Sequence, residues 1–352
     1  MPFRDITGHQ ALLALLARAA SRDTLPQSLI FSGPDGVGKK LTAIALAQAL
    51  NCTQTQARDS SAPDAGGGDD GIDACGVCSI CRRVALGTHP DVRVIPSAIK
   101  VDDIRDVIDS SGYRPFEGKR RVFILDEADG LSNEIQNALL KTLEEPPRSS
   151  SFILVTSRPD LLLPTVRSRC PILRFGRLPT AQVERWLQDH KDVDAATAHA
   201  AAFAAEGSLG RALVEMSDEG AAARQVVEAV WQHVQGSRSP MDKLRAAQLL
   251  LEPGERPRGR AKPGTTRAAS DRELLGTRLQ ALGALLRDAG AIATGTPPAM
   301  LSHAVPADVE QLASRSGLPR VLDAFAAVGR AQEALDRNVS PKTIADWLAF
   351  QL

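Results

Sequence analysis

The chain has 352 residues, a length typical of two or three domains. Lysine and arginine total 42 and aspartate and glutamate total 42, so the formal net charge is zero and excludes a global attraction to nucleic acid or membranes. Hydrophobic residues make up 43%, which excludes a wholly disordered chain, and aromatic residues make up 4%, which leaves few stacking platforms for single-stranded nucleic acid.

The first ten residues, MPFRDITGHQ, carry charge and lack the apolar stretch of a secretory signal. No later run approaches the roughly 18 consecutive apolar residues of a membrane span. We therefore expect a cytoplasmic protein without membrane association, whose cysteines stay reduced.

Short β-rich runs alternate with helical periodicity between residues 28 and 175, which is typical of βαβ units and a parallel sheet. The sequence predicts strands at 28–32, 92–95, 121–125, 152–156 and 172–175, and helices at 39–50, 101–108 and 133–143. Pro146 and Pro147 end the third helix. We predict one α/β domain with a five-stranded parallel sheet over residues 1–176.

Alanine-rich helical segments dominate the rest of the chain. We predict a small helical domain at 177–218 and a larger all-α domain at 219–352. Residues 252–272 combine Pro, Gly, Arg and Thr without apolar periodicity and predict an exposed loop.

The first predicted strand runs into G-P-D-G-V-G-K-K, residues 33–40, which matches the phosphate loop (P-loop) up to its lysine. Gly33, Gly36 and Gly38 would let backbone N–H groups close around phosphate oxygens, and Lys39 would reach the β and γ phosphates. A plain glycine-rich turn is the alternative, but the order strand, loop and helix favours a nucleotide site.

Lys40 departs from this motif, because a P-loop normally has a Ser or Thr there to bind Mg²⁺. Thr42 cannot substitute, since two residues along a helix turn the side chain by roughly 200°. We expect ATP hydrolysis to be lost, while ATP binding is left open.

The third predicted strand ends in D-E-A-D, residues 126–129, and is similar to a Walker B motif. In an active site Asp126 would hold Mg²⁺ and Glu127 would polarise the attacking water. A solvated acidic turn is the alternative, which the preceding P-loop disfavours.

Four cysteines follow the P-loop helix with 22, 2 and 2 residues between them: Cys52, Cys75, Cys78 and Cys81. Two consecutive C-x-x-C steps bring thiolates together on tight turns, and Zn²⁺ is the usual occupant of a four-sulfur site. An iron–sulfur cluster and redox disulfides are the alternatives. We predict a structural zinc module at 52–81, inserted in the α/β domain, and a buried Cys170 outside it.

The segment R-P-D-L-L-L-P-T-V-R-S-R-C follows the fourth strand, and in isolation Arg167 and Arg169 indicate only a solvated cationic pair. The chain also has N-A-L-L-K-T-L-E-E-P-P at 137–147. Together with the P-loop, its cysteine insert, D-E-A-D and S-R-C, this pattern resembles the bacterial clamp-loader AAA+ subunits of DNA polymerase III, and among them the delta-prime branch most. Weaker resemblance extends to G-S-L-G-R-A-L at 207–213 and to N-V-S-P-K-T-I-A-D-W-L at 338–348.

The resemblance implies an AAA+ core, a helical lid and a helical collar that holds a pentamer together. It implies that Arg169 acts as an arginine finger on ATP bound by a neighbouring subunit, that Thr156 lies at the sensor 1 position and that Arg211 is the sensor 2 residue. The implied partners are gamma/tau ATPase subunits, a delta subunit, the sliding clamp and primer–template DNA.

Within this family, Lys40 favours a stator without ATPase activity. The alternative is a gamma/tau-type ATPase, which would be expected to keep a hydroxyl after Lys39. A generic AAA+ remodeller would leave the cysteine insert and S-R-C unexplained together.

Overall fold

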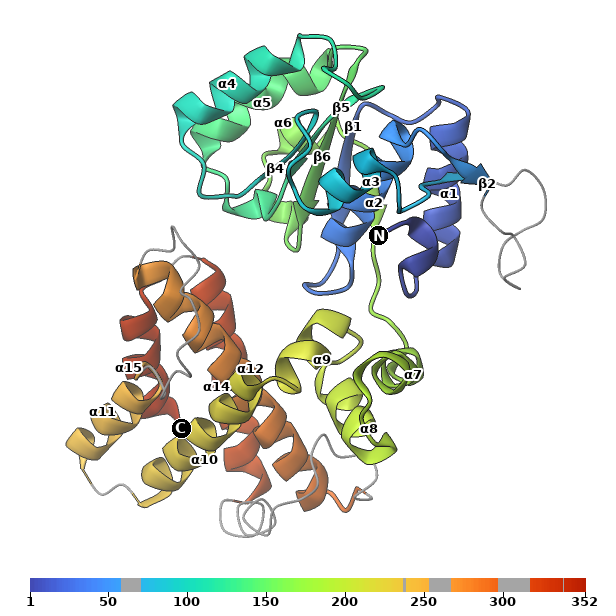
Figure 1. Cartoon of the computed structure of the whole chain (residues 1–352). Helices are drawn as coiled ribbons and strands as arrows, with labels where there is room; N and C mark the ends of the chain where they lie inside the picture. Colours follow the sequence, from blue (N-terminus) through green and yellow to red (C-terminus); the bar gives the residue numbers. More distant parts are fainter. Residues whose placement is uncertain (58–70, 237–238, 253–266, 297–316, 338) are drawn as a thin grey trace. The chain divides into compact units, whose positions relative to one another are not determined.

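The computed structural model describes residues 1–57, 71–236, 239–252, 267–296, 317–337 and 339–352. The described chain divides into two compact units, residues 1–182 with 207–210, and residues 183–206 with 211–352 (Figure 1). The three-domain boundaries at 176 and 218 stay a prediction.

The first unit is built on a parallel sheet of five strands in the order β4-β5-β6-β1-β7. The strands are β1 (Ser28–Ser32), β4 (Val92–Ile95), β5 (Arg121–Leu125), β6 (Ser150–Thr156) and β7 (Ile172–Arg174). The predicted α/β fold is therefore confirmed, with β6 two residues longer at its start than the sequence predicted. In this order β1 lies between β6 and β7, so the P-loop leaves the sheet beside β6, the strand that ends at Thr156.

Both faces of the sheet are buried, because alternate side chains of each strand enter different cores. In β5, Val122 and Ile124 face one core, while Phe123 and Leu125 face the other. Helices α1 (Gln10–Ser21), α2 (Lys39–Asn51) and α3 (Ser79–Ala85) contribute to the first core, and α4 (Val101–Ser111), α5 (Asn133–Glu144) and α6 (Pro164–Arg167) to the second. The near-continuous apolar strands of the sequence are explained by this double coverage.

Local signals set the helix ends. Ser132 caps α5 because its hydroxyl accepts a hydrogen bond from the Ile135 N–H, at 3.3 Å. The prolines at 146 and 147 follow the last turn of that helix, as predicted. Short elements complete the unit: η1 (Phe3–Asp5), η2 (Ala128–Gly130), η3 (Pro159–Leu161) and the antiparallel pair β2 (Gln56–Ala57) and β3 (Ile72–Asp73).

The second unit is helical throughout its described residues. It takes most of α7 (Thr180–Lys191) and α9 (Leu209–Glu215), and contains α8 (Ala195–Ala204), α10 (Asp218–Gly236), α11 (Pro240–Leu249), α12 (Arg267–Ala293), α14 (Leu318–Asp336) and α15 (Pro341–Gln351). The last five of these helices share one apolar core, which includes Trp231, Leu282 and Leu348. The predicted all-α character of this region is confirmed.

One predicted loop is partly wrong. Residues 253–266 lie outside the described residues, but α12 begins at Arg267, inside the segment 252–272 that we expected to be a loop. The Ala-Ala-Ser-Asp-Arg run after Arg267 contains neither glycine nor proline, so nothing in it opposes a helix.

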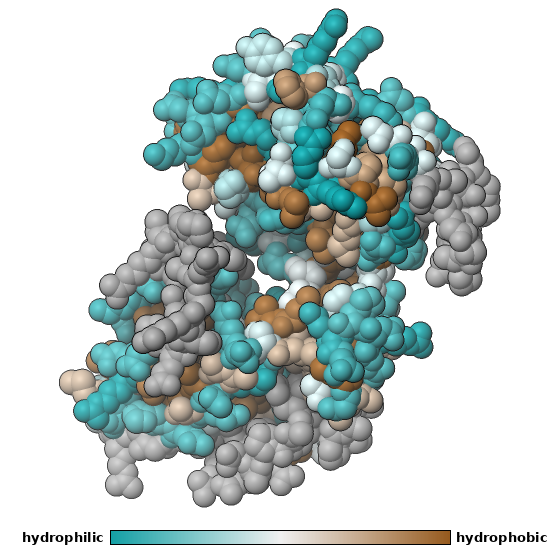
Figure 2. Space-filling model, viewed as in Figure 1, coloured by the Kyte–Doolittle hydropathy of each residue, from teal (hydrophilic) through white to brown (hydrophobic). Residues whose placement is uncertain are grey.

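Among the described residues, no helix is both long and apolar enough to cross a bilayer. Among the coloured residues on the face drawn in Figure 2, hydrophilic side chains form the larger areas, with smaller hydrophobic areas between them.

Candidate nucleotide site and metal centre

The P-loop connects β1 to α2, and its backbone has a shape that only glycine adopts without strain. Gly36 and Gly38 have φ angles of 72° and 102°. A Cβ atom on Gly36 would lie 2.4 Å from the Ser208 hydroxyl and 3.0 Å from the Gly210 Cα. The backbone therefore requires glycine at these positions, and the phosphate-binding role of the loop stays a prediction.

Residues 207–210 close over this loop. The Ser208 hydroxyl donates to the Asp35 carbonyl at 2.7 Å, and the Gly210 N–H donates to the Gly36 carbonyl at 2.9 Å. A Cβ on Gly210 would come within 2.8 Å of the Gly36 Cα. Gly36 and Gly210, which are far apart in the sequence, therefore allow their two backbone segments to pack closely. We did not predict this role.

Lys39 is held inside the loop, with 6% of its side chain exposed. Its ammonium donates to the Gly33 and Pro34 carbonyls, at 2.6 and 2.7 Å, and lies 3.6 Å from the Asp35 carboxylate. Burial lowers the pKa of Lys39 from its ordinary value, although Asp35 opposes that shift. The Lys39 ammonium is thus held mainly by two neutral carbonyl oxygens of the loop itself, with one carboxylate nearby.

Lys40 pairs with the first carboxylate of D-E-A-D. Its Nζ lies 2.7 Å from Asp126 Oδ2, with α2 supplying the lysine and the carboxyl end of β5 the aspartate. Thr42 is buried, and its hydroxyl donates to the Gly38 carbonyl at 3.0 Å within its own helix. The sequence separated Lys40 and Asp126 by 86 residues, and the fold brings them into contact.

The remaining D-E-A-D residues have separate roles. Glu127 has a φ angle of 50° and accepts a hydrogen bond from the Ser97 hydroxyl at 3.3 Å. Asp129 accepts from the Thr156 hydroxyl at 2.7 Å and from the Arg158 Nη2 at 2.7 Å. Asp129 therefore orients Thr156, a role that we did not predict; its only sequence signal was the fourth position of the motif, and the sensor 1 role of Thr156 stays a prediction.

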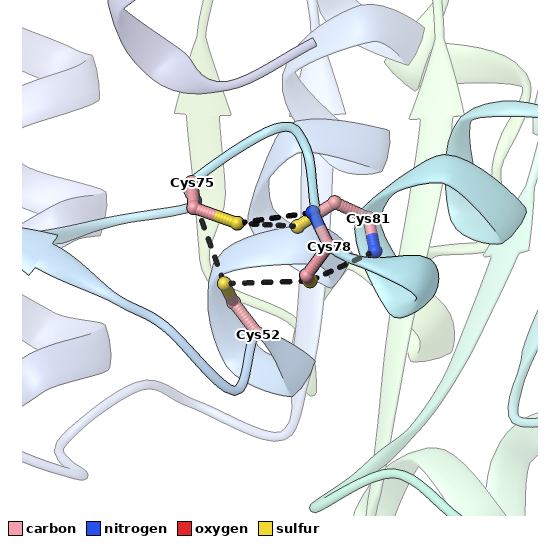
Figure 3. A group of neighbouring side chains, drawn as sticks. All are labelled: Cys52, Cys75, Cys78 and Cys81. Atoms are coloured by element: carbon pink, nitrogen blue, oxygen red, sulfur yellow. Dashed lines mark hydrogen bonds between the residues drawn. The ribbon is translucent and has the colours of Figure 1, made fainter.

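The four predicted cysteines meet where the end of α2, the β3 strand and the start of α3 come together (Figure 3). All four Sγ atoms lie within 4.8 Å of one another, and the Cys52–Cys78 and Cys75–Cys81 sulfur pairs are both 4.0 Å apart. A tetrahedral zinc with Zn–S bonds of about 2.3 Å needs sulfur–sulfur edges of about 3.8 Å. The four thiols therefore fit a zinc ion.

Backbone N–H groups point at these sulfurs and support thiolates. The Cys81 N–H donates to Cys78 Sγ at 3.4 Å, and the Cys75 N–H donates to Cys52 Sγ at 3.4 Å. Burial acts against a thiolate at Cys78, but the Cys81 N–H and the neighbouring thiols lower its pKa to about 6. Burial raises the pKa of Cys81.

Cys170 is buried in the second core of the sheet, apart from the cluster, as predicted.

Residues outside the cysteine cluster form hydrogen bonds to the backbone and side chains next to the cysteines. The Phe3 N–H donates to the Asp73 carboxylate at 2.8 Å, and the Arg4 guanidinium donates to the Ala74 and Cys75 carbonyls, both at 2.9 Å. Gln48 donates to the Cys81 carbonyl at 2.7 Å. Sequence reasoning missed these residues because no local pattern links positions about 30 to 70 residues apart.

Arg169 lies after α6 with a partly exposed side chain. Its Nη2 is 2.8 Å from the Glu144 carboxylate, and its Nη1 donates to the Thr165 carbonyl at 2.9 Å. Arg167 makes a separate pair with Asp160 at 2.9 Å. Arg211 belongs to the second unit, where its Nη1 lies 3.9 Å from Glu206. The trans role of Arg169 and the sensor 2 role of Arg211 stay predictions.

Comparison with known proteins identifies relatives of part of the chain. Residues 8–179 match the family model described as DNA polymerase III, delta subunit. The DNA polymerase III subunit tau of Escherichia coli (strain K12) is 36% identical over 220 residues, which are 60% of this chain and 32% of that protein. The DNA polymerase III subunit gamma of Buchnera aphidicola is 31% identical over 220 residues, which are 60% of this chain and 56% of that protein.

The chain thus spans about a third of the length of the first of these relatives and about half of the second. Among solved structures, a DNA polymerase III gamma subunit-related protein of Thermotoga maritima aligns over 97% of both chains with a TM-score of 0.40 and 15% identity.

Proposed function

We propose that this chain, a member of the DNA polymerase III clamp-loader family through residues 8–179, is a subunit of the delta-prime type. In this role it hydrolyses no ATP, supplies Arg169 to the site of an adjacent ATPase subunit, and helps to load the sliding clamp onto primed DNA. Its partners are gamma/tau and delta subunits in a hetero-pentamer, and its compartment is the cytoplasm.

The observation that carries this proposal is the contact of Lys40 with Asp126, at 2.7 Å. Phosphoryl transfer in P-loop proteins depends on Mg²⁺, which is held by a hydroxyl after the P-loop lysine and by the Walker B aspartate. In this chain Lys40 replaces the hydroxyl, and its ammonium pairs with Asp126, the aspartate of the Walker B-like motif. Of the two usual protein ligands of Mg²⁺, one is replaced and the other is paired with a lysine, while the partly exposed arginine of S-R-C is retained.

The zinc has a structural role in this proposal. Four buried or half-buried thiols leave no coordination position for substrate, which is typical of a structural site rather than a catalytic one. The ion would fix the end of α2, the helix that begins in the P-loop, to β3 and α3.

A gamma/tau-type ATPase is the second candidate. The relatives with 36% and 31% identity are named tau and gamma, and Lys39 is in place. This candidate requires turnover by the chain's own P-loop, whereas the first requires none.

ATP hydrolysis by the purified chain separates the two candidates. We expect turnover far below the roughly 1 s⁻¹ of slow competent enzymes, because Mg²⁺ is poorly held. The same chain should co-purify with gamma/tau and delta subunits, and the assembled complex should hydrolyse ATP when clamp and primed DNA are added. Turnover above that level by the chain alone would establish the ATPase, and failure to assemble would contradict both candidates.

A further inference from the structure

The donor set at the nucleotide site does not fit Mg²⁺. Magnesium needs a nearly octahedral set of oxygen ligands at 2.0–2.1 Å. Of the two protein groups that a P-loop normally offers, one is replaced by Lys40 and the other, Asp126, has Oδ2 only 2.7 Å from the Lys40 ammonium. The nearest replacement hydroxyl along the helix, Thr42, is buried and donates to Gly38.

The groups that bind phosphate are nevertheless kept. The glycine loop keeps its left-handed backbone at Gly36 and Gly38, and α2 begins immediately after it. The Lys39 ammonium is bound by two uncharged carbonyls, and the Asp35 carboxylate near it is largely exposed to solvent. An entering phosphate oxygen therefore competes for Lys39 mainly with neutral acceptors, which are weaker than an anion.

The charges at the site also change in a defined way. Mg²⁺ beside one aspartate leaves a net charge of +1, whereas an ammonium beside the same aspartate leaves zero. The carboxylate is thus neutralised without a metal, and it no longer repels a polyphosphate. Lys39 and the loop N–H groups then supply the positive charge that the ligand meets.

We propose that Lys40 is a built-in cation that takes the place of Mg²⁺ in this site. The site binds the polyphosphate of a nucleoside di- or triphosphate that carries no metal ion. Added Mg²⁺ does not strengthen binding, because the ion finds no protein ligand and competes with the protein for the phosphates. This inference deepens the proposed function, since it makes the P-loop a holder of nucleotide rather than a site of turnover.

The test is isothermal titration of ATP into the full chain, once with excess Mg²⁺ and once with EDTA. We expect wild-type protein to bind at least as tightly in EDTA as in Mg²⁺. The Lys40→Thr variant restores the hydroxyl and frees Asp126, so it should bind about tenfold or more tightly in Mg²⁺ than in EDTA. Lys39→Ala should lose binding in both buffers. Lys191→Thr, which removes an exposed lysine at the end of α7, is the matched control and should behave as wild type.

Two results would overturn the inference: tighter ATP binding by wild type in Mg²⁺ by tenfold or more, or no ATP binding by wild type in EDTA. Retention of Mn²⁺ by the ATP complex, followed by electron paramagnetic resonance, gives a second measurement; wild type should retain none and Lys40→Thr should retain one ion. If Lys40→Thr does not fold, the wild-type buffer comparison decides alone. Assembly with partner subunits is scored separately, so the proposed function and this inference can fail independently.

Discussion

The Arg169 guanidinium already has an anionic partner in its own chain. The Glu144 carboxylate, at the end of α5, lies 2.8 Å away, and about a third of the arginine side chain stays exposed. An exposed ion pair of this kind contributes about 0–1 kcal/mol to stability, so a phosphate of a neighbouring subunit can displace it at little cost. In the proposed role, Glu144 would hold the guanidinium in place until a neighbouring subunit binds.

For this reason we predict that Arg169→Ala leaves folding and assembly intact and lowers the clamp-stimulated ATPase of the assembled loader. An arginine finger accelerates a single site by about 10³ to 10⁵, and the unaffected sites of the complex will dilute the loss. Arg169→Lys should not restore activity, because an ammonium lacks the planar fork of donors. The measurements are the thermal midpoint, recovery of the complex and the ATPase rate.

Arg167→Ala is the control for that variant, because Arg167 lies two residues away and pairs with a different carboxylate, Asp160. It should leave the ATPase rate unchanged. A normal rate in complexes that contain Arg169→Ala would disprove the role in trans, and a loss of thermal stability would indicate a structural arginine instead.

At the scale of elements, Cys52 of the predicted zinc module and the helix α3 support the loop between α4 and β5. Arg83 of α3 donates to Glu117 at 2.8 Å, and the Lys119 ammonium donates to the Cys52 carbonyl at 2.9 Å. The loop carries Tyr113 and Phe116, which are 68% and 81% exposed. These two hydrogen bonds thus tether a loop that carries two large exposed aromatic side chains.

We therefore predict that Cys78→Ser lowers the zinc content well below one ion per chain and increases hydrogen exchange at residues 113–120. The energy of a structural zinc is coupled to folding, so its loss loosens the segments that it joins. Elemental analysis and hydrogen-exchange mass spectrometry measure the two effects. Cys170→Ser, which changes a buried cysteine outside the cluster, should keep the zinc; equal zinc in both variants would contradict the proposed ligand set.

At the scale of the whole molecule, each unit has its own core, and one buried carboxylate ties together distant parts of the first. Asp91 accepts hydrogen bonds from the Phe116, Glu117 and Gly118 N–H groups at 2.8–2.9 Å, and it also lies 3.4 Å from Arg121. Burial by itself would raise the pKa of Asp91, but these donors lower it overall below the ordinary 3.8. The carboxylate therefore stabilises the first unit only while it is ionised.

The lowered pKa of Asp91 determines how the stability of the first unit depends on pH. Because the folded-state pKa is lowered, the stabilisation is fully present above about pH 3.8 and is lost as the pH falls through the folded-state value. We predict that Asp91→Asn lowers the free energy of unfolding of the first unit by about 3 kcal/mol at pH 7, since it loses several charge-assisted hydrogen bonds. The difference from wild type should shrink below pH 3.8.

Hydrogen exchange in β5 measures the first unit by itself. All three tryptophans, at 186, 231 and 347, belong to the second unit, so tryptophan fluorescence provides an internal control that should not change. Asp102→Asn, at an exposed carboxylate of α4, should have no effect on either signal. A pH-independent difference between Asp91→Asn and wild type would contradict the ionisation argument.

The sequence by itself determined what depends on local spacing. Alternation of strand and helix patterns located all five strands of the sheet, because each strand is buried on both faces and each covering helix carries one apolar face. The glycines and Lys39 located the P-loop, and two C-x-x-C steps located three of the four clustered thiols, with Cys52 added from its place after the P-loop helix. These features can be predicted because they depend on residues that lie close together in the sequence.

The tertiary structure alone decided the contacts between residues far apart. It paired Lys40 with Asp126, placed Gly210 against Gly36, and used Asp129 to orient Thr156. No local pattern encodes these contacts, since they depend on strand order and on which side chain meets which across a loop. The sequence indicated that a usual metal ligand was missing, and the fold showed that a cation lies beside the Asp126 carboxylate, to which the motif assigns Mg²⁺.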